Sequence, residues 1–88
     1  MNKWDVKILK KAYGQLKKLP RSIQDIADEA VMDLEKEGPQ PRYWDVKKTG
    51  ENEYRLRLNY RYRMRYAVKE NELFIEVFYV GHRKDAYQ

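Results

Sequence analysis

The pattern of hydrophobic and polar positions changes period near the middle of this 88-residue chain. Residues 4–8 alternate and predict a short, half-buried strand. Residues 12–19 then predict a short helix that ends at Pro20. A second helix is predicted from Ser22, its expected N-cap, to Gly38, which stops it. The apolar stripe of this helix consists of Ile23, Ile26, Ala27, Ala30, Val31 and Leu34.

The second half of the chain has the period of β-strands. Residues 54–58 and 61–69 alternate, and residues 73–80 form an almost continuous apolar run, typical of a central strand with both faces partly covered. A short strand or extended segment is expected around Trp44 and Val46. The order predicts an α+β fold with an N-terminal strand, followed by two helices packed on one face of a small, mainly antiparallel sheet (β-α-α-β-β-β). The whole chain, 1–88, is expected to be one domain.

Five arginines share one parity of two consecutive predicted strands. They are Arg55, Arg57, Arg61, Arg63 and Arg65. The even positions between them are all aromatic or apolar, and none is charged. Side chains two apart share a face of a strand, so one exposed face should carry the arginines if the turn keeps register. No acid in this row pairs with them, although opposite charges across strands are favourable. The pattern favours a phosphate-binding surface over an ordinary solvated face, because guanidinium groups hold phosphates with two parallel hydrogen bonds.

Composition narrows the class of partner. The formal net charge of +5 and the pI of about 9.4 favour an anionic partner such as a nucleic acid. Residues 3–21 hold seven Lys or Arg against one acid, and residues 22–37 hold six acids against one Lys. Because the chain lacks cysteine, no disulfide or thiolate zinc site is available, and a cytoplasmic location is expected. No apolar run approaches the roughly 20 residues needed to cross a bilayer, so no membrane association is expected. The sequence has no cluster of His, Asp and Glu that would indicate a metal cofactor.

The order of elements, with the segments LKKLPRSIQ, GPQPRYWDVKK, YRLRL, YRMRY and VGHRKDAY, resembles the RelE branch of the RelE/ParE toxin superfamily over essentially the whole chain. The resemblance implies a fold similar to that of microbial ribonucleases. It also implies a toxin endoribonuclease that cleaves mRNA in the ribosomal A site, close to ribosomal RNA, and so inhibits translation. A cognate antitoxin protein would silence it.

The resemblance also implies roles for individual residues. Arg55 and Arg57 match basic positions that grip the mRNA backbone, and Arg63 matches the arginine that contacts the scissile phosphate. Arg83 matches a second catalytic arginine, and Tyr87 matches a C-terminal tyrosine that helps to activate the attacking 2′-hydroxyl. Further RNA-binding candidates are Arg61, Arg65, Lys47 and Lys48.

The chemistry of RNA cleavage can be assessed from residue types as well. Attack of the 2′-hydroxyl on the adjacent phosphate needs in-line geometry, a base, an acid and cations for the phosphorane charge, but no metal. Arg63 and Arg83 are the candidate cations. Tyr87 is one candidate base, because nearby guanidinium groups favour a phenolate. His82, where other family members carry lysine, is the alternative, because a histidine titrates nearer neutral pH.

Two further questions stay open at this point. Tyr43, Trp44 and Tyr60 are able to stack on unpaired bases beside arginines, but a small core depends on its aromatics, so Trp4 and Trp44 are expected to fill it. The same basic sheet also suits a non-catalytic protein that binds RNA or the ribosome. A third function is inhibition of DNA gyrase, the activity of the ParE branch, which generally lacks the arginine and tyrosine set found here.

Overall fold

The computed structural model describes residues 3–84, which form a five-stranded sheet and two α-helices. The chain runs from strand β1 (Asp5–Ile8) through helices α1 (Lys10–Lys17) and α2 (Arg21–Glu37). It continues through strands β2 (Val46–Gly50), β3 (Glu53–Arg57) and β4 (Tyr62–Lys69), a 3₁₀ turn (Glu70–Glu72) and strand β5 (Phe74–His82). Strands β2 to β5 pair antiparallel in sequence, and β1 joins β5 in parallel, giving the order β1-β5-β4-β3-β2.

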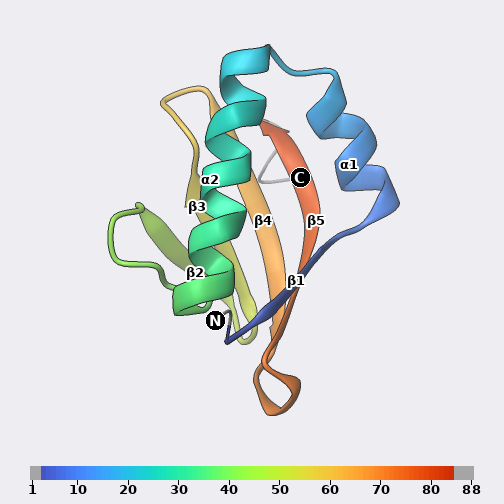
Figure 1. Ribbon diagram of the computed structural model, residues 1–88. Coiled ribbons are helices and arrows are strands. Elements are labelled where there is room, and N and C mark those ends of the chain that lie inside the picture. The colour runs from blue at the N-terminus through green and yellow to red at the C-terminus, as the bar shows by residue number, and fades with distance from the viewer. Residues whose placement is uncertain (1–2, 85–88) are drawn as a thin grey trace.

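Both helices lie on the same face of the sheet, with α2 crossing its middle and α1 lying beside β5 (Figure 1). This is the predicted α+β arrangement, and the segment around Val46 adds a fourth strand to the antiparallel part. The opposite face of the sheet has no helix over it among the described residues.

The hydrophobic core lies between the helices and the even-numbered positions of β3 and β4. Tyr54 and Leu56 of β3 stand opposite Tyr66 and Met64 of β4, and all four are buried. The helices contribute Ala12, Leu16, Ile23, Ala27, Ala30 and Leu34. The predicted parity of these two strands is therefore correct, since their apolar positions meet the helices.

The apolar run in β5 reflects a change of parity inside the strand. Val77 and Tyr79 pair with consecutive residues of β4, so Phe78 between them is an extra residue. Such a bulge shifts the alternation by one position, which allows Val77 and Val80 both to be buried in the core. The continuous run arises from this bulge as well as from the central place of β5 between β1 and β4.

The start of α2 differs from the prediction. The helix begins at Arg21, so Ser22 lies inside its first turn and is not the N-cap. Pro20 takes that position, because its carbonyl oxygen already accepts hydrogen bonds from the N–H groups of Ile23 and Gln24, at 2.9 and 3.1 Å.

Tyr66 ties the core to the segment that follows α2. Its buried side chain stacks on Tyr54 with the ring centroids 5.8 Å apart, and its hydroxyl donates a hydrogen bond to the carbonyl oxygen of Pro39. Burial, and secondarily the neighbouring Tyr54, raises the pKa of Tyr66 above its usual value. The phenol therefore stays protonated and keeps its bond to the loop between α2 and β2.

We predict that Tyr66→Phe lowers the free energy of unfolding by about 1–2 kcal/mol, because the carbonyl of Pro39 loses its donor. Urea unfolding followed by circular dichroism measures the change. Since the pKa of Tyr66 is raised in the folded state, its contribution is present below about pH 10 and is lost above it, and this loss should be absent from the variant. Tyr43→Phe is the control, because that side chain is 83% exposed. Equal destabilisation by both substitutions would contradict the prediction.

Candidate nucleic-acid interface

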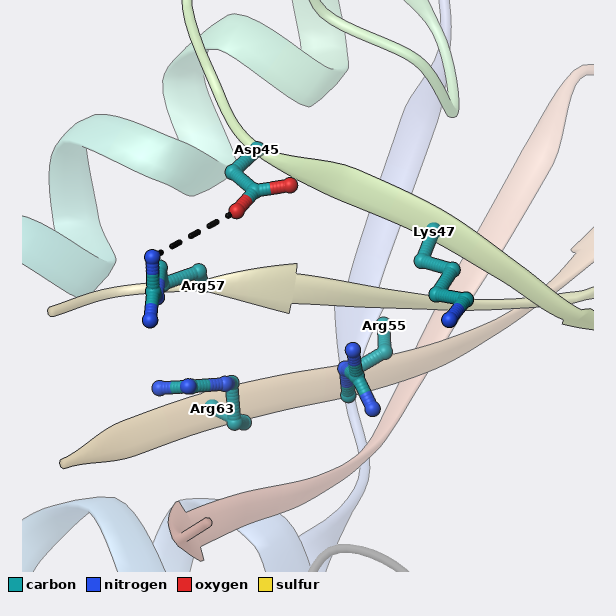
Figure 2. Close-up of a pocket in the computed structure, with 5 residues that line it drawn as sticks. All are labelled: Asp45, Lys47, Arg55, Arg57 and Arg63. Atoms are coloured by element: carbon teal, nitrogen blue, oxygen red, sulfur yellow. Dashed lines mark ion pairs between the residues drawn. The ribbon is translucent and has the colours of Figure 1, made fainter. Parts of the chain in front are cut away.

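Cationic side chains form two rows across the face of the sheet opposite the helices. In the first row, Lys47 of β2 is paired with Arg55 of β3, which is paired in turn with Arg65 of β4. In the second row, Arg57 of β3 is paired with Arg63 of β4. We call these five residues the basic face. Figure 2 shows four of them, all except Arg65, around a polar cavity of about 130 Å³.

The register places like charges directly opposite each other in this face. Arg55 stands across from Arg65, and Arg57 stands across from Arg63. Such cross-strand pairs are unfavourable, whereas opposite charges in the same positions would stabilise the sheet. The arrangement therefore weakens the free fold slightly, and an anion between the guanidinium groups would relieve the repulsion.

Two carboxylates offset part of this charge, and the expectation of an arginine face without acids was wrong. Asp45 Oδ2 lies 3.7 Å from Arg57 Nη1, and Glu53 Oε1 lies 3.5 Å from Arg65 Nη2. Both acids precede the arginine segment in sequence and reach it only through the strand pairing. Their side chains are well exposed, and exposed ion pairs contribute at most about 1 kcal/mol. Five cations against two carboxylates leave the basic face positive.

Arg63 differs from the other arginines because it is buried within the site. Its side chain is only 7% exposed, although the parity pattern predicted a wet surface. The Nη1 group donates hydrogen bonds to the carbonyl oxygens of Asn59, at 2.5 Å, and Tyr62, at 3.1 Å. These carbonyls belong to the chain between β3 and the start of β4, and they hold the guanidinium in one orientation beside the cavity that it lines.

The turn that holds Arg63 is itself fixed by Asn59. The side-chain Oδ1 of Asn59 accepts hydrogen bonds from the N–H groups of Arg61, at 2.8 Å, and Tyr62, at 2.9 Å. The N–H of Leu58 also donates to the carbonyl oxygen of Tyr62 at 3.0 Å. Sequence reasoning missed Asn59. The available signal is an asparagine in a short connection between alternating strands, where it typically bonds its own backbone.

Tyr79, also missed, covers the β5 side of the site. Gly81 stands opposite Arg63 in the sheet and has no side chain to place there. The Tyr79 ring takes that space, since a Cβ at Gly81 would lie 2.6 Å from Tyr79 Oη. The hydroxyl donates a hydrogen bond to the carbonyl oxygen of His82 at 3.1 Å, which fixes the ring. Arg63 thus has an arginine on one neighbouring strand and a tyrosine ring over the other.

Two of the predicted RNA-binding residues lie outside the basic face. Arg61 is exposed in the turn before β4, and its Cζ lies 5.2 Å from the centroid of the Tyr60 ring. Lys48 has the opposite parity from Lys47, because it is paired with Tyr54, and its Nζ lies 6.0 Å from the centroid of that ring. One step along a strand reverses the face, so Lys48 belongs to the helix side of the sheet.

The predicted catalytic residues at and after the end of β5 lie in different surroundings. Arg83 is exposed, and its N–H donates to the carbonyl oxygen of Arg61 at 2.6 Å, which places its backbone beside the β3–β4 turn. His82 is paired with Tyr62, and the two rings meet edge to face with centroids 5.9 Å apart. Tyr87 lies outside the described residues.

His82 does not line the cavity of the basic face. Its Nδ1 accepts a hydrogen bond from the N–H of Lys84 at 3.2 Å. It borders a separate cavity of about 340 Å³ between β5 and the α1 end of the helical layer, together with Gln15, Lys18 and Leu19. The structure therefore brings Arg63 and His82 to adjacent strands but not into one site.

The two tryptophans are structural, as the core interpretation predicted. Both pack against the hydrophobic core, and Trp44 Nε1 donates a hydrogen bond to Asp33 Oδ2 at 2.7 Å. Trp4 lies against Gly38, where a Cβ would come within 2.9 Å of its Nε1. In contrast, Tyr60 is 60% exposed.

Within residues 3–84, no three His, Asp or Glu side chains lie close enough together to hold a metal ion. The helices of the same residues are too short or too polar to cross a membrane.

Residues 6–87 match the family model of the ParE toxin of the type II toxin–antitoxin system parDE. The chain belongs to the ParE toxin family. It is therefore the toxin of a toxin–antitoxin pair, and the predicted membership of the RelE/ParE superfamily is confirmed. Among curated proteins, none matches the toxin.

Solved structures of RelE-like proteins share its fold. A chain of the archaeal RelE–RelB complex from Pyrococcus horikoshii OT3 is 28% identical with a TM-score of 0.78, covering 94% of the toxin and 98% of that chain. A chain of the RelB–RelE complex from Methanococcus jannaschii is 24% identical with a TM-score of 0.76, covering 92% and 94%. The YoeB dimer from Staphylococcus aureus is 15% identical with a TM-score of 0.73, covering 89% and 94%. The last two establish likeness of fold alone.

We predict that Arg55→Thr makes the toxin's stability less dependent on salt. In the wild type, added salt screens the repulsion between Arg55 and Arg65 and raises the free energy of unfolding. Urea unfolding at low and high sodium chloride measures this rise. Lys48→Thr, on the other face of the neighbouring strand, is the matched control and should keep the wild-type salt response. The same reduction in both variants would mean that overall charge, and not the cross-strand pair, causes it.

Proposed function

We propose that the toxin is a metal-independent endoribonuclease that cleaves mRNA in the ribosomal A site by attack of a 2′-hydroxyl on the scissile phosphate. The observation that carries the proposal is the Arg57–Arg63 pair in the basic face, with Arg63 held by two backbone carbonyls beside a cavity. A guanidinium that is oriented before binding can donate hydrogen bonds to a phosphodiester without losing further side-chain entropy.

The chemistry asked of the protein is modest. Arg63 would contact the scissile phosphate and stabilise the charge of the phosphorane, while Arg57 and Arg55 hold the flanking backbone. Arg83 is the second proposed cation, supported by the hydrogen bond that joins its backbone to Arg61 at the same end of the sheet. If the ribosome aligns the mRNA, the toxin needs only to complete this site.

We assign the role of proton acceptor to Tyr87 rather than His82. His82 bonds the N–H of Lys84 and borders the α1-side cavity, so its ring is engaged away from Arg63. The assignment to Tyr87 rests on the family resemblance of the VGHRKDAY segment.

A partner protein is also proposed, namely a cognate antitoxin that keeps the toxin inactive. Membership of a type II toxin–antitoxin family supports it, as does the similarity to a chain of the Pyrococcus horikoshii RelE–RelB complex. Other proposed contacts are with the ribosome, where exposed lysines would bind ribosomal RNA phosphates; the candidates are Lys10, Lys11, Lys17 and Lys18.

Gyrase inhibition, the activity of the ParE branch, is the second candidate function, because the matching family model is that of the ParE toxin. Two assays with purified toxin, one of translation and one of DNA supercoiling, separate the activities. In a translation extract, the nuclease produces new mRNA 5′ ends within codons, and mapping those ends detects it. A non-catalytic binder stalls translation without new ends, and a gyrase inhibitor leaves mRNA intact but blocks DNA supercoiling. Either of these last two outcomes would refute the proposed nuclease.

We predict that Arg63→Lys lowers mRNA cleavage by about 100-fold or more, because an ammonium group cannot bond the turn carbonyls and bind phosphate in the same fork geometry. Quantitative mapping of 5′ ends measures the loss. Lysine keeps the charge and most of the side-chain volume, which limits unfolding of this buried position, and thermal melting checks it. Lys69→Gln is the control, since Lys69 lies on the same strand and face but pairs with Phe74 at the far end. Wild-type cleavage by Arg63→Lys would exclude Arg63 from the site.

We predict that His82→Gln leaves the cleavage rate within a few-fold of wild type. Glutamine retains an acceptor for the N–H of Lys84, and His82 lies outside the basic face. A general acid or base contributes about 100- to 10,000-fold, so a loss of that size in the same assay would return the proton-transfer role to His82.

A further inference from the structure

The β3–β4 turn presents an exposed aromatic ring that the proposed cleavage site does not use. Tyr60 is 60% exposed at the tip of this turn, and the Cζ of Arg61 lies 5.2 Å from its ring centroid. We propose that the Tyr60–Arg61 pair is a stacking site for an unpaired nucleobase of the strand whose phosphate lies at Arg57 and Arg63. The inference rests on the proposed function, because it names a second contact with the same polynucleotide.

The turn is held rigid around this pair. Asn59 Oδ1 accepts hydrogen bonds from the N–H groups of Arg61 and Tyr62, and the carbonyl oxygen of Arg61 accepts one from Arg83, at 2.6 Å. Figure 1 shows the turn at the same end of the sheet as the end of β5. A platform that is already ordered loses little conformational entropy when a base stacks on it, which favours binding.

The stacking site and the phosphate site are directly connected. The carbonyl oxygen of Asn59, the residue before Tyr60, accepts the 2.5 Å hydrogen bond from Arg63 Nη1. A phosphate at Arg63 and a base on Tyr60 would therefore contact neighbouring parts of one short stretch of strand. A single strand can supply both groups, whereas the bases of a duplex are stacked on each other and inaccessible.

The chemistry of the pair suits a base without selecting its identity. Every nucleobase has a π face, and aromatic rings and guanidinium planes both stack on it. Arg61 adds positive charge next to the ring, which complements the flanking phosphates. The site therefore adds affinity for unpaired bases with little preference among them.

A second exposed tyrosine provides a matched control. Tyr13 of α1 is 50% exposed, and Lys17 Nζ lies 5.1 Å from its ring centroid. It resembles Tyr60 in exposure and in having a cation over the ring, but its helix lies on the other side of the sheet from the basic face. Removing the Tyr13 ring tests whether any exposed tyrosine affects RNA binding.

The experiment measures binding of the purified toxin to two fluorescent oligomers of equal length by anisotropy at low salt. One is a single-stranded oligouridylate with blocked 2′-hydroxyls, and the other carries the same sugar–phosphate backbone without bases. We expect wild type to bind the base-containing oligomer about 5- to 100-fold more tightly. Tyr60→Ala should abolish this preference without weakening binding to the abasic oligomer. Tyr60→Phe and Tyr13→Ala should both keep the preference.

The outcomes separate this inference from the proposed function. Equal wild-type affinity for the two oligomers, or equal weakening of both by Tyr60→Ala, would overturn the stacking site and leave phosphate binding by the basic face intact. Failure of the wild type to bind either oligomer would contradict the basic face as a polynucleotide interface, and the proposed nuclease with it.

Discussion

The alternation of side chains along β3 and β4 is the constraint on which the rest of the structure depends. Leu56 and Met64 are fully buried, and the residues beside them on each strand are the paired arginines of the basic face. Burying such a side chain stabilises the fold by about 1.5–3 kcal/mol, whereas a like-charged cross-strand pair costs about 0.2–1 kcal/mol. The core therefore outweighs the repulsion, and the sheet can hold a charge pattern that would not assemble by itself.

The second feature that shapes the site is the anchoring of Arg63. An exposed arginine has many rotamers and loses that freedom on binding, but two turn carbonyls already restrict this one. Asn59 carries the restraint one step further, by fixing the turn itself. The folding of one short turn thus prepares the guanidinium for an anion, and the same turn displays Tyr60.

Charge is distributed across the molecule as well as along the chain. The acids of α2 include the exposed Asp25, Asp28 and Glu29, and the helix lies on the face of the sheet opposite the arginines. A polyanion is therefore attracted to the basic face and repelled by the acidic surface of α2, which orients its approach. This separation follows from the fold, because helices and sheet must bury their apolar sides against each other and so expose their polar sides in opposite directions.

Local patterns in the sequence were sufficient for the helices, the strand parities and the basic face as a whole, because period and side-chain direction are properties of single elements. The bulge at Phe78, the pairing of Asp45 and Glu53 with arginines, and the separation of Lys48 from Lys47 depend on how strands align with one another. The burial of Arg63 and the placement of His82 in a different cavity were likewise decided only in three dimensions, the first by a turn carbonyl and the second by the packing of β5 beside α1. A sequence states which residues alternate, and only tertiary packing decides which of them meet.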